Sequence, residues 1–312
     1  MNVANLRPNS FEEFVGKDEI KESLKIYINA ALQQKKTLDH LLFYGYAGNG
    51  KTSLAGIVAK ELNKKIHYIQ GPTIKHPSDV LDIISMLEEG DIIFVDEIHN
   101  VEHKCLELFY SILEDFVVDI KIGKDLNSMY NRLQVPKFTF IASTTNLGKL
   151  PEAFIERFPI KFYFDTYKNE EIFLILKRLN LFNKELLEDS ELQTLAHSSK
   201  GNPRIAINLY RRFFDYRFLY PDWLAEKILN SIGIFNDGLE KLDLNYLRVI
   251  YNNFGKPIGI KTISQSLSVD QKTIESKIEP FLLKRGYIMK KTNGRILTSK
   301  GFEIVSPLLN EI

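Results

Sequence analysis

The fold is decided by residues 45–52, GYAGNGKT, which satisfy the phosphate-loop pattern G-x-x-x-x-G-K-[ST]. An apolar run at 40–44 precedes this loop and an amphipathic run at 52–62 follows it, as a strand–loop–helix unit requires. Glycines let backbone N–H groups converge on phosphate oxygens, and the N-terminus of the helix adds positive potential. We therefore predict a nucleotide site in which Lys51 reaches the β- and γ-phosphates and the Thr52 hydroxyl binds Mg²⁺. The loop residues predicted to bind the nucleotide are Gly48, Gly50, Lys51, Thr52 and Ser53.

An acidic pair closes the apolar run at 92–96. We expect Asp96 to hold the magnesium ion, directly or through water, and Glu97 to polarise the water that attacks the γ-phosphate. His99 follows at once, and the sequence leaves open whether it is coupled to this site or is a surface histidine.

Polar residues also follow the apolar run at 138–143. A hydroxyl or amide of Thr144, Thr145 or Asn146 could hydrogen-bond the γ-phosphate and its water, although a plain strand-to-loop turn would have the same composition. Two arginines complete the set. Arg157 could act as a finger toward a neighbouring subunit, and Arg204 could sense the γ-phosphate, because a guanidinium offers a planar fork that stays charged; spacing alone also allows both to be surface residues.

The first half of the chain alternates short apolar runs with amphipathic ones. Such alternation predicts an α/β fold with a parallel sheet covered on both faces. The expected strands are 40–44, 66–70, 92–96, 138–143 and 160–164. The expected helices are 21–33, 52–62, 77–87 and 103–115. Residues 117–135 break the rhythm and predict a β-hairpin, because apolar and polar residues alternate before a polar turn at Gly123.

From residue 167 the pattern becomes helical and then changes again. Helical periodicity at 169–179, 190–198, 203–218 and 223–232 predicts a helical bundle. After a loop at 235–238, a winged-helix pattern follows, with helices at 243–254, 260–267 and 270–284 and strands at 287–289 and 296–299. Pro280 predicts a kink or an early end in the third of these helices. We therefore predict three domains, 1–165, 166–236 and 237–312.

The composition is that of a globular protein: 312 residues with 44% hydrophobic, 12% aromatic and 26% charged residues. These values exclude a disordered, collagen-like or coiled-coil chain. The one cysteine, Cys105, excludes a disulfide framework and a zinc ribbon within one chain. Without an apolar N-terminal region or a run long enough for a bilayer, we expect a cytoplasmic protein that does not associate with membranes.

The net charge of +1 conceals a basic C-terminal part. Residues 239–312 hold twelve Lys and Arg against seven Asp and Glu, a net charge of +5, and residues 284–300 contain no acid. Such a stripe on a helix end and wing suits phosphate contacts, although a solvated charged face is the alternative. The predicted DNA contacts are Lys290, Lys291 and Arg295, with Arg295 expected at the tip of the wing. Because backbone contacts carry no sequence information, binding should depend on shape and salt.

With these residues in place, the chain resembles the RuvB family of Holliday-junction branch-migration motors, in the AAA+ class of ATPases. The resemblance runs from Leu6 to about Thr298. Its most specific pieces are Leu6-Arg7-Pro8, Phe14-Val15-Gly16, Leu38-Asp39-His40-Leu41-Leu42, Gly71-Pro72, Asp96-Glu97-Ile98-His99, Glu114-Asp115-Phe116, 119–124, Thr144-Thr145 and 201–206.

The resemblance implies an AAA+ P-loop domain, a helical lid and a C-terminal winged-helix domain, with ATP or ADP and Mg²⁺ as ligands. It implies the catalytic residues Lys51, Thr52, Asp96, Glu97, Thr145 (first sensor region) and Arg157 (arginine finger). For the nucleotide it adds Arg7, Val15, Tyr167, Pro203 and the second-sensor arginine Arg204. The sequence departs from the family pattern at Phe14, Asn146, Pro159 and Asn202.

The resemblance also implies partners. Similar proteins form a hexameric ring on duplex DNA at four-way junctions, and the hairpin at 117–135 looks like the one that docks on RuvA, the junction-binding protein. We therefore expect an ATP-driven translocase that powers branch migration in recombination and repair. Two alternatives stay open at this point: a clamp-loader-like ATPase that loads another protein onto DNA, and a DNA-binding regulator whose ATPase core is only structural.

Overall fold

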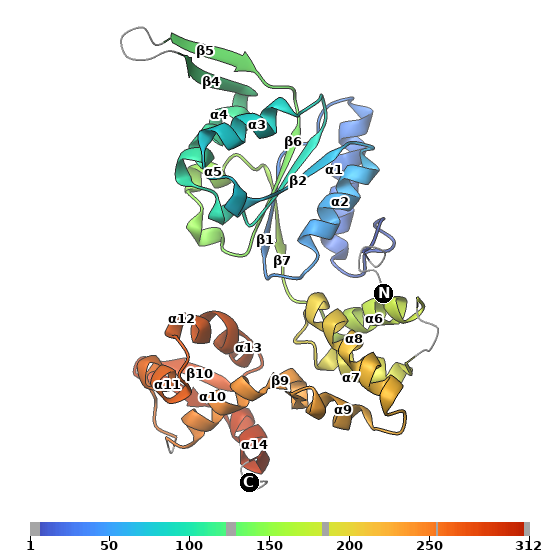
Figure 1. Cartoon of the computed structure of the whole chain (residues 1–312), viewed down its shortest axis with the longest axis vertical. Coiled ribbons are helices and arrows are strands. Elements are labelled where there is room, and N and C mark those ends of the chain that lie inside the picture. Colours follow the sequence, from blue (N-terminus) through green and yellow to red (C-terminus); the bar gives the residue numbers. More distant parts are fainter. Residues whose placement is uncertain (1–6, 123–128, 183–186, 254, 309–312) are drawn as a thin grey trace. The chain divides into compact units, whose positions relative to one another are not determined.

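The computed structural model describes residues 7–122, 129–182, 187–253 and 255–308. The chain divides into two compact units (Figure 1). The first unit comprises Met1–Leu179 with Asn202–Arg204, and the second comprises Asn180–Gly201 with Ile205–Ile312.

The first unit is built on a parallel sheet with the strand order β2-β3-β6-β1-β7. The strands are β1 (Leu41–Gly45), β2 (Ile66–Gln70), β3 (Ile92–Asp96), β6 (Thr139–Thr144) and β7 (Ile160–Phe164). Consecutive residues of β3 and β6 are buried, as expected for strands covered on both faces. The predicted α/β sheet is confirmed, and β1 and β6 lie one residue later than the sequence predicted.

Helices cover the two faces of this sheet. The helices on its faces are α1 (Asp18–Gln33), α2 (Lys51–Glu61), α3 (Pro77–Ser85), α4 (His103–Asp115) and α5 (Glu152–Ile155), and α6 (Asn169–Asn180) follows β7. In β3, Phe94 packs in one core cluster with residues of α1 and α2, whereas Ile93 and Val95 pack in another with residues of α3, α4 and α5. The alternation of side chains along a strand thus builds two cores from one apolar run.

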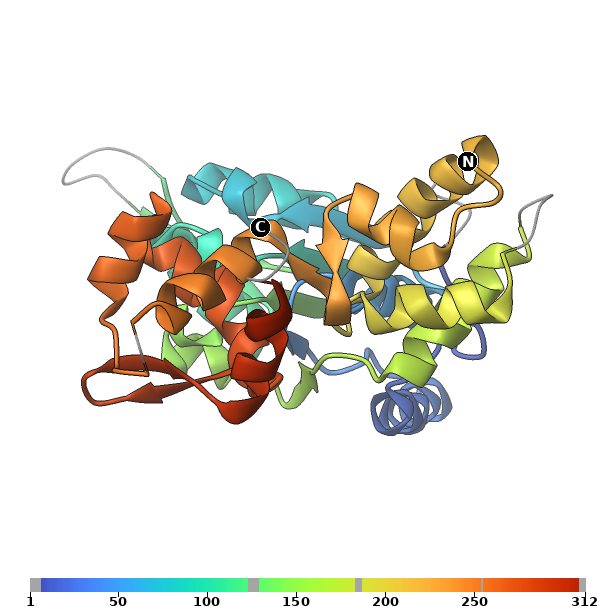
Figure 2. The same ribbon diagram turned by 90° about the horizontal axis from the view of Figure 1, so that it is seen from below.

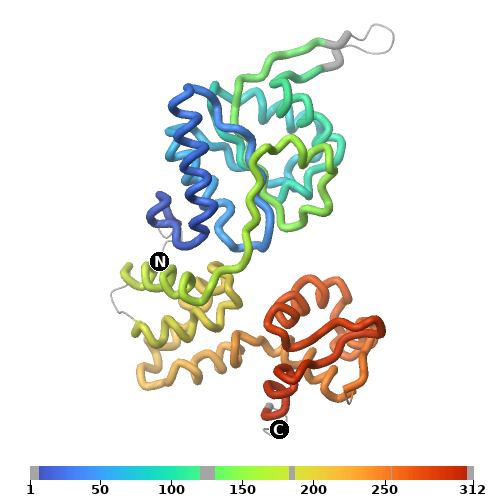
Figure 3. Tube along the Cα trace, turned by 180° about the vertical axis from the view of Figure 1, so that it is seen from behind, coloured from blue at the N-terminus to red at the C-terminus, as the bar shows by residue number. Residues whose placement is uncertain are grey.

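A β-hairpin leaves the first unit after α4. Strands β4 (Val117–Ile122) and β5 (Met129–Gln134) pair antiparallel from Val117↔Gln134 to Ile122↔Met129. Figures 1 and 3 show this hairpin extending beyond the rest of the unit. The predicted hairpin is present, and its turn at Gly123 falls outside the described residues.

The second unit begins with helices and ends with a winged helix. Its elements are α7 (Asp189–His197), α8 (Pro203–Leu219, whose first two residues belong to the first unit), α9 (Ala225–Ser231), β8 (Ile234–Phe235), β9 (Leu239–Glu240), α10 (Lys241–Tyr251), α11 (Ile260–Leu267), α12 (Gln271–Thr273), α13 (Glu279–Lys284), β10 (Ile288–Lys291), β11 (Gly294–Leu297) and α14 (Ser299–Leu308). In Figure 2 the red β10–β11 hairpin runs along the outside of the orange helices.

Three local predictions were incomplete in the second unit. The stretch predicted as a loop at 235–238 is a 3-10 turn between the two short strands β8 and β9. A π-helical turn at Ile274–Ile278 interrupts the predicted third helix just before Pro280, which lies in the first turn of α13, where its missing N–H costs no hydrogen bond. Helix α14, where the sequence predicted only the end of a strand, adds Val305 to the core of the winged helix.

Candidate active site

The phosphate loop joins β1 to α2 and depends on two glycines. Gly48 and Gly50 have φ angles of 79° and 91°, which favour glycine. A Cβ at Gly48 would lie 2.6 Å from Oδ1 of Asn202, and one at Gly50 would lie 2.8 Å from Cζ of Phe14. Since α2 begins at Lys51, the first N–H groups of this helix have no partner within the helix and are available to phosphate oxygens.

Lys51 is buried within the loop that it serves. Its side-chain Nζ donates to the carbonyl oxygens of Gly45 and Tyr46, at 2.8 Å each. Burial lowers the pKa of Lys51 to about 8, and the carboxylates of Glu97 and Asp96 oppose this shift. A phosphate group is a stronger acceptor than either carbonyl, so this ammonium is placed to bind one.

Asp96 ends β3 next to β6 and is oriented by a residue that the sequence had not assigned. The Ser143 hydroxyl of β6, which is fully buried, donates to Oδ1 of Asp96. The Thr52 hydroxyl and Asp96 offer oxygen ligands, and Mg²⁺ usually takes one or two protein ligands beside phosphates and waters, so these residues fit the ion. In the ranges that the structure describes, no group of three or more His, Cys, Asp or Glu forms a metal centre.

Glu97 has a left-handed backbone with a φ of 53° and a carboxylate held by its neighbours. Its Oε2 accepts hydrogen bonds from the backbone N–H of Thr145 at 3.2 Å and from its hydroxyl at 2.9 Å. His99 Nδ1 lies 3.1 Å from the same oxygen and 2.9 Å from the Thr144 hydroxyl. The His99 side chain is only 9% exposed, so it belongs to this cluster and is not a surface histidine.

The start of α8 lies against the phosphate loop. The Asn202 side chain donates from Nδ2 to the carbonyl of Ala47 at 2.8 Å, and its Oδ1 accepts from the backbone N–H of Arg204 at 3.0 Å. Pro203 occupies the first position of the helix, and the charge of Arg204 contributes to the lowered pKa of Lys51. Residues 202–204 are thus brought to the loop as the sequence predicted.

Of the three residues predicted to surround the base, Tyr167 lies against the phosphate loop and the residue after Val15 lies against Tyr167. Tyr167 is buried, and its hydroxyl lies 3.4 Å from the carbonyl of Asn49. Gly16, next to Val15, approaches the Tyr167 ring so closely that a Cβ would lie 3.1 Å from Cε1. Arg7 is exposed and acts electrostatically on Tyr68 of β2.

Arg157 lies at the opposite end of the sheet from the loop. It precedes the amino end of β7, whereas the loop follows the carboxyl end of β1, and these strands pair in parallel from Leu41↔Ile160 to Gly45↔Phe164. Five residues of strand span about 16 Å, so Arg157 does not reach the loop of its own chain.

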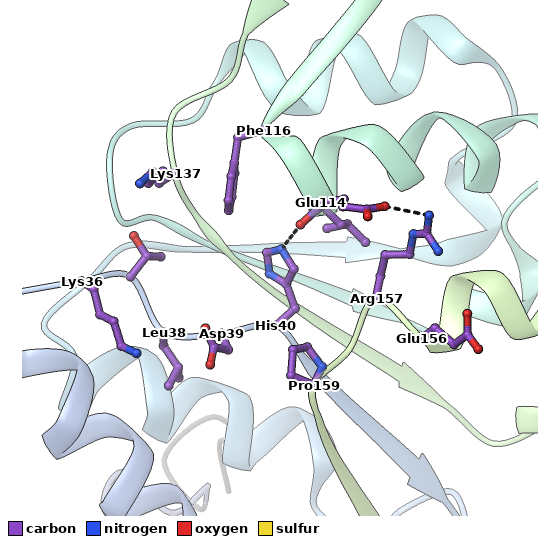
Figure 4. Close-up of a pocket in the computed structure, with 12 residues that line it drawn as sticks. Lys36, Leu38, Asp39, His40, Glu114, Phe116, Lys137, Glu156, Arg157 and Pro159 are labelled. Atoms are coloured by element: carbon purple, nitrogen blue, oxygen red, sulfur yellow. Dashed lines mark hydrogen bonds and ion pairs between the residues drawn. The ribbon is translucent and has the colours of Figure 1, made fainter. Parts of the chain in front are cut away.

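The guanidinium of Arg157 is held beside a cavity of about 630 Å³ (Figure 4). It donates to Glu114 Oε2 and to the carbonyl of Ala153, both at 2.8 Å, and lies 5.1 Å from the ring centre of Tyr110. Its Nε is buried and has no hydrogen-bond partner among the described residues.

The wing of the second unit is partly neutralised. The buried carboxylate of Glu279 accepts from Arg295 Nε at 2.7 Å and from the Tyr246 hydroxyl at 2.9 Å, and it pairs with Lys290 at 2.6 Å. The expectation that Arg295 lies at the tip is wrong, because it pairs with Lys290 across the hairpin and Thr292 and Asn293 form the turn. Lys291 is exposed near that turn.

Comparisons with known proteins agree with this architecture. Residues 6–164 match the family described as the Holliday junction DNA helicase RuvB P-loop domain, and residues 236–306 match the RuvB C-terminal winged helix domain. The Holliday junction branch migration complex subunit RuvB of Ureaplasma urealyticum is 44% identical over 300 residues, with 96% of each chain covered. The Mycoplasma genitalium subunit is 40% identical over 299 residues, 95% of this chain and 96% of that one.

A solved structure leads to the same family. The Thermotoga maritima RuvB Holliday junction branch migration motor has a TM-score of 0.82 and 33% identity, covering 96% of this chain and 98% of that one. No helix in the described part of the chain is long and apolar enough to cross a membrane. On the two matched domains and these full-length relatives, the chain belongs to the RuvB family.

Proposed function

We propose that this protein is an ATP-driven translocase that moves duplex DNA through Holliday junctions, as a ring that works with a RuvA-like junction-binding protein in the cytoplasm. The observation that carries the proposal is the separation of the two halves of the ATPase site. The loop and the acidic pair lie at one edge of the sheet, and Arg157 lies at the other. A second copy of the chain must therefore supply the arginine, and repeating that contact closes a ring.

Each residue has a defined task in ATP hydrolysis. Bound magnesium would neutralise charge on the β- and γ-phosphates, held by Thr52 and Asp96. Lys51 binds the same phosphates, and Glu97 accepts a proton from the attacking water once its carboxylate leaves Thr145. Thr145, released from Glu97, is then free to contact the γ-phosphate, and Arg204 at the start of α8 responds to the same group.

The remaining parts connect this site to DNA and to the partner. We assign residues 1–165 to the nucleotide-binding core, 166–236 to the lid and 237–312 to the DNA-binding winged helix. The exposed Lys291 and the neighbouring Lys290 are the first candidates for phosphate contacts, with Arg295 holding the wing in place. The β4–β5 hairpin is the candidate docking element for the RuvA-like partner. A clamp-loader-like switch is not favoured, since the relatives that match along the whole chain are RuvB proteins.

The test is subunit mixing. Lys51→Ala and Arg157→Ala should each abolish ATP turnover while retaining DNA binding. A mixture of equal parts should regain activity, because about one interface in four of a randomly mixed ring pairs an intact loop with an intact finger. Arg178→Ala is the matched control, since Arg178 is similarly exposed (28% against 24%) and also pairs with one carboxylate, Glu13.

Two results would contradict the proposal. Full turnover by Arg157→Ala would show that Arg157 is not an arginine finger. A mixture without activity would show that the site is not shared between two subunits. Migration of a synthetic four-way junction, dependent on ATP and on the RuvA-like protein, separates a translocase from a clamp loader, which would turn over ATP without moving the branch point.

A further inference from the structure

His40, at the entry to β1, makes two hydrogen bonds within the core. Its Nε2 lies 3.0 Å from the carbonyl oxygen of Leu113 in α4, and its Nδ1 lies 3.0 Å from the backbone nitrogen of Phe140 in β6. Only 6% of the residue is exposed, and burial lowers its pKa to about 4. The ring is therefore neutral at physiological pH, with Nε2–H donating to Leu113 and Nδ1 accepting from Phe140.

The bond to Leu113 fixes the last turn of α4. The final four carbonyls of a helix have no partner within it, and α4 ends at Asp115, before Phe116 turns into the left-handed region with a φ of 53°. The Leu113 carbonyl lies at the edge of this unpaired turn. His40 also packs against the ring of Phe116, with centroids 5.8 Å apart. The position of this turn is thus tied to β1.

The same end of α4 holds Arg157. Glu114, adjacent to Leu113, accepts from Arg157 Nη2 at 2.8 Å, and Tyr110, one turn earlier, presents its ring to the guanidinium at 5.1 Å. Figure 4 shows both dashed contacts, from His40 to α4 and from Arg157 to Glu114, at one wall of the cavity. A guanidinium has five N–H groups, and those to Glu114 and Ala153 leave two terminal ones for a phosphate.

We propose that His40 is a positioning residue for Arg157: by holding the last turn of α4, it directs the guanidinium toward the nucleotide of the neighbouring subunit. The inference rests on the proposed function, in which Arg157 acts across the interface. Misplacing a catalytic group by about 1 Å costs roughly 100-fold in rate, so a loosened turn should show in turnover even when the fold is retained.

Two amide substitutions separate this role from a purely structural one. The short amide of His40→Asn reaches the place of Nδ1, so it retains the bond to Phe140 and loses the bond to Leu113. The longer amide of His40→Gln reaches the place of Nε2, so it retains Leu113 and loses Phe140. Each variant loses one buried hydrogen bond, and we expect similar decreases in Tm.

Turnover should nevertheless differ between the two variants. We expect His40→Asn to lower kcat roughly tenfold or more with an unchanged Kd for a fluorescent ATP analogue, and His40→Gln to stay within about threefold of the parent. Equal losses of kcat in both variants would overturn the proposal.

A substitution at the protein surface tests the same proposal if His40→Asn does not fold. Glu114 is 62% exposed, so Glu114→Ala, which removes the acceptor of Arg157 Nη2, should leave Tm unchanged and lower kcat without changing the nucleotide Kd. Unchanged kcat in Glu114→Ala would show that the end of α4 does not direct Arg157. Failure of the proposed function gives a different result, because Arg157→Ala alone would then retain full turnover.

Discussion

Gly71 offers a direct way to move the carboxylate of Glu97, the proposed catalytic base, without changing it. This residue follows β2 and is buried beneath the turn that carries Glu97. A Cβ added at Gly71 would lie 2.3 Å from the carbonyl oxygen of Glu97 and 2.9 Å from its carbonyl carbon. Both atoms are backbone, so Gly71→Ala must displace the turn after β3 by about 1 Å to restore an ordinary contact distance.

The expected effect is large on turnover and moderate on stability. A shift of about 1 Å at a catalytic group costs roughly 100-fold in kcat, and overpacking a buried site costs about 1–3 kcal/mol. Nucleotide affinity should change little, because the loop and Lys51 follow β1, which β6 separates from β3. The assay is steady-state phosphate release with saturating ATP, together with urea unfolding and binding of a fluorescent nucleotide.

Gly148→Ala is the control, because the nearest atom to its added Cβ is 4.0 Å away. It should match the parent in all three measurements. The reasoning is refuted if Gly71→Ala loses stability as expected but retains kcat within threefold, since Glu97 would then tolerate the displacement.

Three further predictions concern titration and DNA binding. Burial lowers the pKa of His40 from about 6.5 to about 4 in the folded chain. The neutral ring therefore contributes about 3 kcal/mol to the free energy of unfolding above pH 6.5, and this contribution is lost as the pH falls toward 4. Urea unfolding should show the loss in the parent and not in His40→Gln. Burial lowers the pKa of Lys51 to about 8, so nucleotide affinity should weaken as the pH rises above 8. Calorimetry should then show that the protein takes up protons when the nucleotide binds. Lys51→Arg should show neither effect, because arginine stays charged. Lys291→Ala should lower the slope of log Kd for DNA against log salt by about 1 without changing Tm, because Lys291 is exposed. Arg295→Ala should instead lower the free energy of unfolding by about 3 kcal/mol, because it removes a partner from the buried Glu279.

The parts of the fold that the sequence predicted well are those set by local patterns. The continuous apolar run at 92–95 placed β3 to the residue, because a strand covered on both faces has no polar position within it. The edge strands β2 and β7 were also predicted to the residue, although they contain His67 and Lys161 and are only partly buried. The phosphate loop was equally accessible, since its glycines, lysine and threonine are contiguous. The parallel order of the strands then placed Asp96 and Thr145 at the same edge of the sheet as the phosphate loop, because the carboxyl ends of parallel strands meet there.

The parts that the sequence did not predict depend on pairing between distant residues. Nothing near Asp96 indicates that Ser143 will orient it, and the only signal was a hydroxyl at the buried end of an apolar run. Glu279 lies outside the acid-free stretch at 284–300, so the sequence could not show that it neutralises Lys290 and Arg295. A charge stripe read along the chain therefore overestimates the charge available to DNA.

The entry into α8 carries contacts of two kinds, one in each unit of the chain. Asn202 contacts the phosphate loop through Ala47, within the first unit. Two residues earlier, within the second unit, Lys200 pairs with the buried Asp243 at 2.6 Å and lies 4.7 Å from the ring centre of Phe281. Lys200 has a φ of 56° and Gly201 one of 68°, so both residues between these contacts have left-handed backbones. The loop contact and the winged-helix contact therefore belong to different units although they lie only two residues apart in the chain.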